Sequence, residues 1–214
     1  MKRLMILAAL ALVATFPTLT ADENSWMLRF GAVNVSPNDD SGQVLGADGI
    51  AVGDDTQLGF NITYMFDKNW GVEVLGANPF EHSLTGTGTL AGLPLGTTSH
   101  LPPTVSAIYN FDTEGDTMYH VGVGINHTKF FEDYPSDELR SALAVSDLDL
   151  SASTGLSFKA GFDTPIAENW YFSGGIYYMM IETDADIIIG GVTALTVPVD
   201  INPWVLMLGF GTTF

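Results

Sequence analysis

TQLGFNITYMF, residues 56–66, alternates between apolar side chains and small or polar ones. In an extended chain, successive side chains point to opposite faces. One face therefore carries the apolar residues Leu58, Phe60, Ile62, Tyr64 and Phe66. The other face carries Gln57, Gly59, Asn61 and Thr63. Alternation sustained over this length predicts a β-strand with one apolar face.

The same alternation returns along the rest of the chain. Counting residues 56–66, there are eight such runs, at about 26–36, 56–66, 70–82, 101–111, 118–131, 148–162, 169–183 and 204–214. Aromatic residues mark the ends of these runs, as they do at the membrane interfaces of outer-membrane barrels. They are Trp26, Trp70, Tyr109, Phe111, Tyr119, Trp170 and Phe214.

Short and long connections alternate between the runs. The short ones are 67–69, 112–116 and 163–168, and the long ones are about 37–55, 83–99, 132–147 and 184–200. This asymmetry is typical of an outer-membrane barrel with short periplasmic turns and long external loops. A secreted β-sandwich also gives alternating strands, but it does not predict such long strands or strictly alternating loop lengths. We therefore predict an all-β fold, an eight-stranded antiparallel transmembrane β-barrel.

Composition narrows the function classes. The chain combines a positive mean hydropathy with a formal charge of −18, and it contains no cysteine. Disulfides and thiolate metal sites are therefore excluded, and we expect no metal or cofactor. Its seven basic residues are scattered, whereas a nucleic-acid surface needs clustered Lys and Arg. Beyond the N-terminus no run of about 18 apolar residues exists, so a membrane location requires a closed barrel.

The N-terminus has the pattern of a secretory signal peptide. Lys2 and Arg3 precede an apolar stretch that ends near the small residue Ala21. That stretch is too short for a transmembrane helix, although an N-terminal membrane anchor is the alternative. We predict a signal peptide at 1–21 and one barrel domain at 22–214, exported through the periplasm to the outer membrane of a Gram-negative cell.

Several motifs resemble one family, the OmpW family of outer-membrane proteins (OmpW/AlkL-like). The most specific are His100-Leu101-Pro102-Pro103-Thr104 and Gly122-Val123-Gly124-Ile125-Asn126. Further matches are Thr56-Gln57-Leu58-Gly59, Thr63-Tyr64-Met65, Gly71-Val72-Glu73, Pro79-Phe80, Thr128, Phe130-Phe131, Trp170 and Asp200 to Trp204. The resemblance implies a narrow apolar lumen through which small hydrophobic compounds pass. It also implies that phage or colicins use the variable external loops of some members.

Strand directions give the predicted lumen two levels. With both termini periplasmic, the inward charged residues lie near the periplasmic end and form a polar plug of Arg29, Glu73, His120 and Lys159. Inward positions above them are apolar and line the lumen with Val33, Val35, Ala77, Met179, Ile181 and Val205. We predict the constriction between the two levels at Leu75 and Tyr177. Ordinary packing in a narrow barrel is the alternative for both sets.

Prolines suggest a lateral opening in the barrel wall. Pro79 lies high on the third predicted strand, and Pro102 and Pro103 begin the fourth strand beside it. Proline has no N–H to donate to a strand ladder, so two neighbouring strands with prolines at one height should pair poorly there. The alternative is that these prolines only end the pairing at the loop.

The pattern as a whole predicts a passive channel for small hydrophobic molecules, in contact with outer-membrane lipid and lipopolysaccharide. A structural, adhesive or receptor-type barrel with a filled lumen is the alternative, and an ion-conducting pore is a third. Enzymatic chemistry has little support, and we expect no enzyme. His82 and His100 flank one loop and can approach each other, but they show no metal-ligand spacing or nucleophile–base pair.

Overall fold

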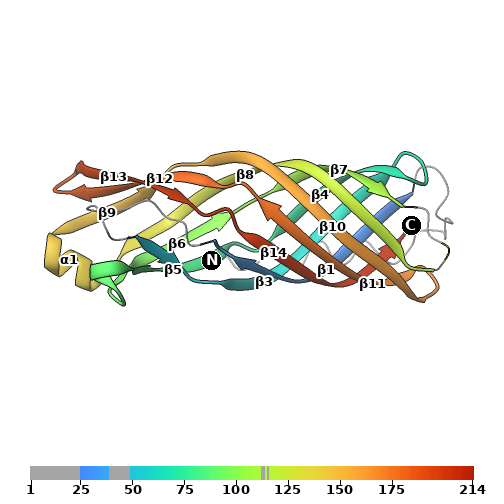
Figure 1. The fold of residues 1–214 in the computed structure, drawn as a ribbon, viewed down its shortest axis with the longest axis horizontal. Helices are drawn as coiled ribbons and strands as arrows, with labels where there is room; N and C mark the ends of the chain where they lie inside the picture. The colour runs from blue at the N-terminus through green and yellow to red at the C-terminus, as the bar shows by residue number, and fades with distance from the viewer. Residues whose placement is uncertain (1–24, 39–48, 112–113, 115) are drawn as a thin grey trace, which may run out of the picture.

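The computed structural model describes residues 25–38, 49–111, 114 and 116–214; the predicted signal peptide lies outside these residues. Eight antiparallel strands form the barrel: β1 (Trp26–Ser36), β3 (Asp55–Met65), β4 (Trp70–Ala77), β7 (Thr104–Asn110), β8 (Met118–Pro135), β10 (Ser153–Ala167), β11 (Trp170–Met179) and β14 (Trp204–Thr213). The ring closes because β1 pairs with both β14 and β3, while β8 pairs with both β7 and β10. Figure 1 shows the resulting long barrel. The predicted eight-stranded barrel is confirmed.

Alternation sets the two faces of the barrel wall. On β3 the side chains of Leu58, Phe60 and Ile62 face outward and are exposed, whereas Asn61 and Thr63 face inward and are buried. An apolar exterior is expected where lipid surrounds a barrel. The aromatic residues at the strand ends, including Trp26 and Trp70, also face outward. The tight turn predicted at 67–69 joins β3 to β4.

Close strand contact explains a pair of glycines in the wall. Gly31 on β1 pairs directly with Gly209 on β14. A Cβ atom on Gly31 would lie 2.1 Å from the carbonyl oxygen of Leu208, and one on Gly209 would lie 2.0 Å from that of Phe30. Only glycine allows the backbones to approach this closely.

Where the structure describes them, the predicted long loops are mostly strands, which corrects the prediction of loops. They form β2 (Ile50–Val52), β5 (Phe80–Gly86), β6 (Pro94–Leu101), β9 (Val145–Leu150), β12 (Glu182–Ile189) and β13 (Val192–Asp200), with a short 3-10 helix at Gly88–Leu90 and helix α1 (Asp137–Leu143). β13, β12 and β9 make a three-stranded sheet, and β2, β5 and β6 continue the barrel wall upward. We call this end of the molecule, at the left of Figure 1, the loop end.

Several predicted strand boundaries were wrong: the run 169–183 breaks at Met180 and Ile181, and the run 101–111 breaks at Pro102 and Pro103. The run 70–82 is two strands, separated at Asn78 and Pro79, and the run 148–162 is broken at Ser151 and Ala152. The break in the run 148–162 reverses the faces: Leu148 and Leu150 of β9 point inward, whereas Leu156 and Phe158 of β10 point outward. The predicted turn at 163–168 instead continues β10 to Ala167, with a bulge near Pro165 that accommodates the proline.

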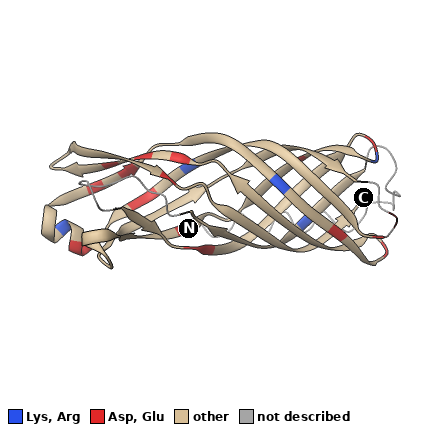
Figure 2. Cartoon of the chain, viewed as in Figure 1, with Lys and Arg blue, Asp and Glu red and all other residues tan. Residues whose placement is uncertain are grey.

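Helix α1 is short and capped. Ser136 accepts a hydrogen bond from the Leu139 amide at 3.0 Å, and Leu139 is buried. None of the described residues forms a helix long and apolar enough to span a membrane. In Figure 2 the acidic residues lie mainly towards the two ends of the molecule, and the lipid-facing middle has few charges.

Candidate functional site

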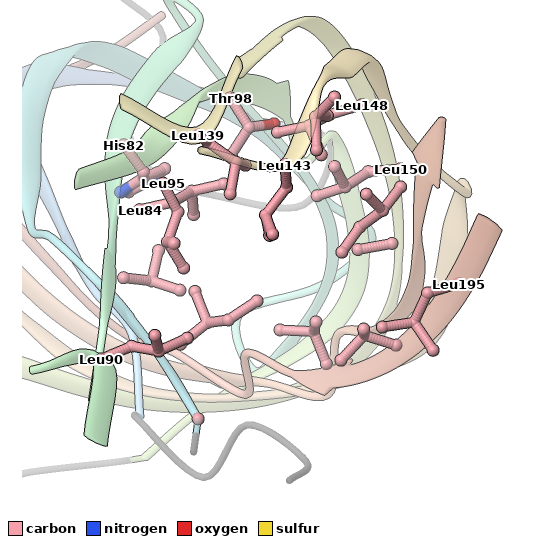
Figure 3. A pocket seen from close by; sticks show the side chains of 18 of the residues that line it. His82, Leu84, Leu90, Leu95, Thr98, Leu139, Leu143, Leu148, Leu150 and Leu195 are labelled. Atoms are coloured by element: carbon pink, nitrogen blue, oxygen red, sulfur yellow. The ribbon is translucent and has the colours of Figure 1, made fainter. Parts of the chain in front are cut away.

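An apolar cavity of about 270 Å³ occupies the loop end (Figure 3). Its walls come from β2, β5, the 3-10 helix, β6, α1, β9, β12 and β13. Most of the side chains that line it are aliphatic: Ile50, Val52, Leu84, Leu90, Leu95, Leu139, Leu143, Val145, Leu148, Leu150, Ala185, Ile187, Ile189, Ala194, Leu195, Val197, Val199 and Ile201. A concave apolar site with few polar groups is the usual form of a small-molecule site.

Three polar side chains line the cavity among the described residues: His82, Thr98 and His100. The Thr98 hydroxyl donates a hydrogen bond to Oδ1 of Asp133 at 2.5 Å. Burial raises the pKa of Asp133, and the nearby carboxylates of Asp149 and Asp147 add to that effect. Because the Thr98 hydroxyl donates to Asp133, it has no hydrogen left to donate to a molecule in the cavity.

His82 and His100 form an imidazole pair. Their Nε2 atoms lie 2.8 Å apart, and the ring centroids are 4.8 Å apart with an interplanar angle of 22°. His82 Nδ1 contacts the carbonyl oxygen of Gly53 at 2.5 Å. The rings of Phe80 and Phe130 lie 5.5 Å and 5.7 Å from that of His100. Both imidazoles are 2% exposed, so aromatic and aliphatic groups shield the pair from water.

This pair lies beyond the lipid-facing band, since the outward side chains beside it, Glu81 and Lys129, are charged and exposed. Burial lowers the pKa of His100 to about 3, and the neighbouring His82 contributes. Burial also lowers the pKa of His82, against the opposing effects of Gly53, Asp55 and Asp54. Both imidazoles are therefore neutral near pH 7.

Directly below the imidazole pair, the strand ladder is interrupted. Leu75 pairs with Thr104, and the next pair above is Phe80 with His100. Within this described part of the wall, no ladder pair joins residues 76–79 to 101–103. Both segments remain hydrogen-bonded to the strand on their other side. The Asn78 amide donates to the Leu58 carbonyl oxygen at 2.8 Å, and the His127 amide donates to the Pro103 carbonyl oxygen at 3.0 Å.

The prolines account for this interruption. Backbone polar groups of successive strand residues point to alternate sides. Because Pro103 faces β8, Pro102 faces the opposite side, towards β4. Pro102 therefore faces the interruption and has no N–H to donate there, and Pro79 in the facing segment also lacks an N–H. Pro103, the third predicted residue, faces away from it.

The predicted polar plug residues come together near the other end of the barrel. Arg29 binds Asp163 through two hydrogen bonds of 2.9 Å and 2.7 Å, and its Nη1 lies 3.5 Å from Glu73. Glu73 also forms an ion pair with Lys159. The four side chains are at most 3% exposed. Two cations and two anions thus neutralise each other in a filled interior, the structural pairing weighed as the alternative.

His120 lies beside this network, with Nε2 3.7 Å from Asp163 Oδ2. Neither of its ring nitrogens has a hydrogen-bond partner among the described residues. Thus His120 is near the other predicted plug residues but does not share their hydrogen bonds.

The predicted constriction residues lie between the two levels. Tyr177 is 1% exposed, and its hydroxyl donates to Glu73 at 3.1 Å. Leu75 and Tyr177 belong to one buried apolar cluster with the predicted lining residues Val33, Val35, Met179, Ile181 and Val205, and Ala77 packs against it. None of these residues is among those that line the cavity. They pack together at mid-height, and the open space lies higher than predicted.

Some residues of both levels were missed by the sequence analysis. Asp163 had been assigned to a turn, although it follows Lys159 and Gly161 at alternate positions and so faces inward with them. Asn61 and Thr63 accept hydrogen bonds from Arg29 at 3.1 Å and 2.9 Å. The cavity lining was missed because its strands had been interpreted as loops.

Comparisons with known proteins agree with this architecture. The sequence matches the OmpW family over residues 22–214. Outer membrane protein W of Vibrio cholerae serotype O1 is 38% identical over 212 residues, covering 97% of each chain. The crystal structure of the outer membrane protein OprG from Pseudomonas aeruginosa superposes with a TM-score of 0.81 at 35% identity, covering 90% of this chain and 97% of that one. The dibenzothiophene metabolism operon protein PahQ of Pseudomonas aeruginosa is 27% identical over 199 residues, covering 91% of this chain and 90% of the relative.

Proposed function

This chain belongs to the OmpW family of outer-membrane β-barrel proteins, and we propose that it is a passive, non-catalytic channel for small hydrophobic molecules. The observation that carries the proposal is the apolar cavity at the loop end, with the ladder interruption directly beneath it. The name of the relative PahQ refers to dibenzothiophene metabolism, which concerns a compound of the same apolar class.

Capture follows from the chemistry of the cavity wall. Aliphatic side chains from six strands surround the space, so a hydrocarbon that enters it leaves water. Each buried methylene contributes roughly 0.8 kcal/mol, and an alkane that buries six of them gains about 5 kcal/mol. That gain is enough to collect a sparingly soluble molecule without an energy source.

Release is proposed to occur through the wall, between Pro79 and Pro102. His100 lines the cavity, and its backbone forms the first ladder pair above the interruption. A molecule at the cavity floor is therefore next to the stretch of wall that lacks ladder pairs. The hydrocarbon of the bilayer is as apolar as the cavity, so a cargo molecule leaves without losing its transfer free energy.

The barrel floor favours this sideways route over a straight one. Below the cavity lie the packed side chains of Leu75 and Tyr177, and below them the network of Arg29, Glu73, Lys159 and Asp163. An apolar molecule moving straight down would have to separate these buried ion pairs, at a cost of several kcal/mol.

Filling the cavity tests this function. Ala185 lies in the cavity wall, where it pairs with Leu150 and Val197. Ala185→Phe should place a ring in the cavity and reduce uptake of radiolabelled octane towards the rate of cells that lack the protein. Ala107→Phe is the matched control, because Ala107 faces outward on β7, and it should leave uptake unchanged.

The competing function is a structural or adhesive barrel whose loop end contacts other molecules. It predicts equal octane uptake in cells with and without the protein at matched surface levels. That result, or full uptake through Ala185→Phe, would rule out the cavity as the route.

A further inference from the structure

The direction of hydrogen bonding in the imidazole pair can be read from its fixed end. The Gly53 carbonyl only accepts, so the His82 nitrogen that contacts it, Nδ1, carries the proton. A neutral imidazole has one N–H, and His82 Nε2 is therefore an acceptor. The proton shared between the two rings must come from His100 Nε2. His100 Nδ1 is then left as an unprotonated acceptor.

This acceptor is buried and has no hydrogen-bond partner among the described residues. Its residue is 2% exposed and lines the apolar cavity. A buried acceptor without a partner costs free energy that a ligand recovers if it donates a hydrogen bond there. An apolar cavity with one such acceptor discriminates between ligands that carry a donor and ligands that do not.

The rest of the described lining points the same way. The Thr98 hydroxyl donates its hydrogen bond to Asp133, and the His82 Nδ1–H donates to the Gly53 carbonyl. The lining side chains thus offer acceptors to a ligand and no uncommitted N–H or O–H. A carbonyl or ether oxygen in the ligand would find no side-chain donor there, and a charged group would be desolvated without a counter-ion.

We propose that the cavity preferentially binds apolar molecules that carry a single hydroxyl donor, such as phenols and long-chain alcohols, and that this hydroxyl donates to His100 Nδ1. The inference rests on the proposed function and refines it by naming the cargo class. Burial lowers the pKa of both imidazoles, which keeps this hydrogen-bond direction near neutral pH.

Three probes of nearly one shape separate the inference from the function on which it rests. Binding of naphthalene, 1-methoxynaphthalene and 1-naphthol would be measured with the full-length protein in lipid nanodiscs, and empty nanodiscs would correct for partition into lipid. Naphthalene binding tests the apolar cavity. The ratio of 1-naphthol to 1-methoxynaphthalene affinity tests the acceptor. We expect 1-naphthol to bind about tenfold more tightly, the usual effect of one hydrogen bond to a buried partner.

His100→Phe supplies the matched variant, since it keeps an aromatic ring between Phe80 and Phe130 and removes the acceptor. In that variant 1-naphthol and 1-methoxynaphthalene should bind equally. Retention of the preference for 1-naphthol in His100→Phe would overturn the assignment. Equal binding of all three probes to the unaltered protein would overturn the inference and leave the proposed function standing. Failure of all three to bind would count against both.

Nitrogen NMR of the unaltered protein gives a second test that needs no variant. The ¹⁵N shifts of a neutral imidazole distinguish its protonated from its unprotonated nitrogen. We expect an unprotonated Nδ1 in His100 and a protonated Nδ1 in His82, and addition of 1-naphthol should shift the His100 Nδ1 signal. A protonated His100 Nδ1 would refute the proposal directly.

Discussion

Glu73 neutralises two cations inside the barrel, and its replacement by Gln tests how that interior is held together. The carboxylate forms an ion pair with Lys159 and lies 3.5 Å from Arg29. It also accepts hydrogen bonds from Tyr177 at 3.1 Å and from Thr63 at 3.2 Å. Glu73→Gln keeps the size of the side chain and removes its charge. The buried ammonium of Lys159 then loses its anion.

The magnitude follows from burial. Both partners are at most 2% exposed, so water cannot replace the lost carboxylate. Removing one member of such a pair typically costs about 3–5 kcal/mol, whereas replacing both members by uncharged groups is often close to neutral. Glu73→Gln alone should therefore lower the free energy of unfolding by about 3–5 kcal/mol. Adding Lys159→Met should recover at least about 2 kcal/mol of that loss, because Arg29 and Asp163 still neutralise each other.

Equilibrium unfolding in urea, followed by tryptophan fluorescence of the barrel in lipid vesicles, measures these differences. Glu81→Gln is the control: Glu81 is exposed on β5, and its replacement should change stability by no more than about 0.5 kcal/mol. The double variant should also keep octane uptake, since the proposed route leaves the barrel above the network. A double variant that is less stable than Glu73→Gln would refute the charge-balance argument. Loss of uptake with intact folding would refute the sideways route.

Three further predictions concern the upper half of the molecule. Pro102→Val supplies the missing N–H at the ladder interruption and should slow octane uptake without weakening naphthalene binding. Pro103→Val is the control, because residue 103 faces β8, and it should leave uptake unchanged. Equal effects of the two variants would exclude a lateral opening between these strands. Tyr177→Asp puts a second carboxylate beside Glu73 and should lower the free energy of unfolding, whereas Tyr177→Phe, which loses one hydrogen bond, should change it by only about 1 kcal/mol; unchanged stability of Tyr177→Asp in urea unfolding would contradict the contact of Tyr177 with Glu73. The pKa of His100 is about 3 in the folded chain and near 6.5 in the unfolded chain, so the unfolded chain takes up the proton first as pH falls. The free energy of unfolding should therefore decrease below pH 6.5, by about 3 kcal/mol at pH 4.5. Amide exchange on β6 should accelerate accordingly at pH 4.5, after correction for the intrinsic rate, and an acid-independent rate would contradict the pKa argument.

The polar network shows what the alternation of side chains along a strand predicts and what it does not. Alternation placed Arg29, Glu73 and Lys159 on the inward face, and the structure finds all three there. The same rule includes Asp163, but Pro165 two residues later suggested a turn. The bulge at Pro165 lets the strand continue, and no local signal in the sequence distinguishes a bulge from a turn at that point.

The cavity required information that alternation does not contain. Its walls combine α1 with strands far apart in the sequence, such as β2 and β13. These segments face water outside and the cavity inside, so no lipid requirement imposes a regular apolar exterior on them, and their glycines and acidic residues resemble loops. Their pairing depends on non-local contacts, including those of β12 with β9 and β13.

For the imidazole pair, the sequence predicted that the two residues could meet but not the direction of the hydrogen bond between them. The sequence showed that His82 and His100 flank one loop and can meet, because a hairpin brings its two strands together. The identity of the proton donor depends on Gly53, which β2 and the segment after it bring alongside β5. Only the folded chain decides that direction, and with it the kind of ligand that the cavity favours.

The sequence by itself determined the barrel, its strand number and the inward charges, because lipid outside and a narrow interior constrain every second residue in the same way along the whole chain. The tertiary structure decided where the open space lies, where the wall loses its ladder pairs and which nitrogen of His100 remains free. Each of these depends on a backbone group or side chain from a distant segment, a strand pairing or a carbonyl position, which local periodicity does not specify.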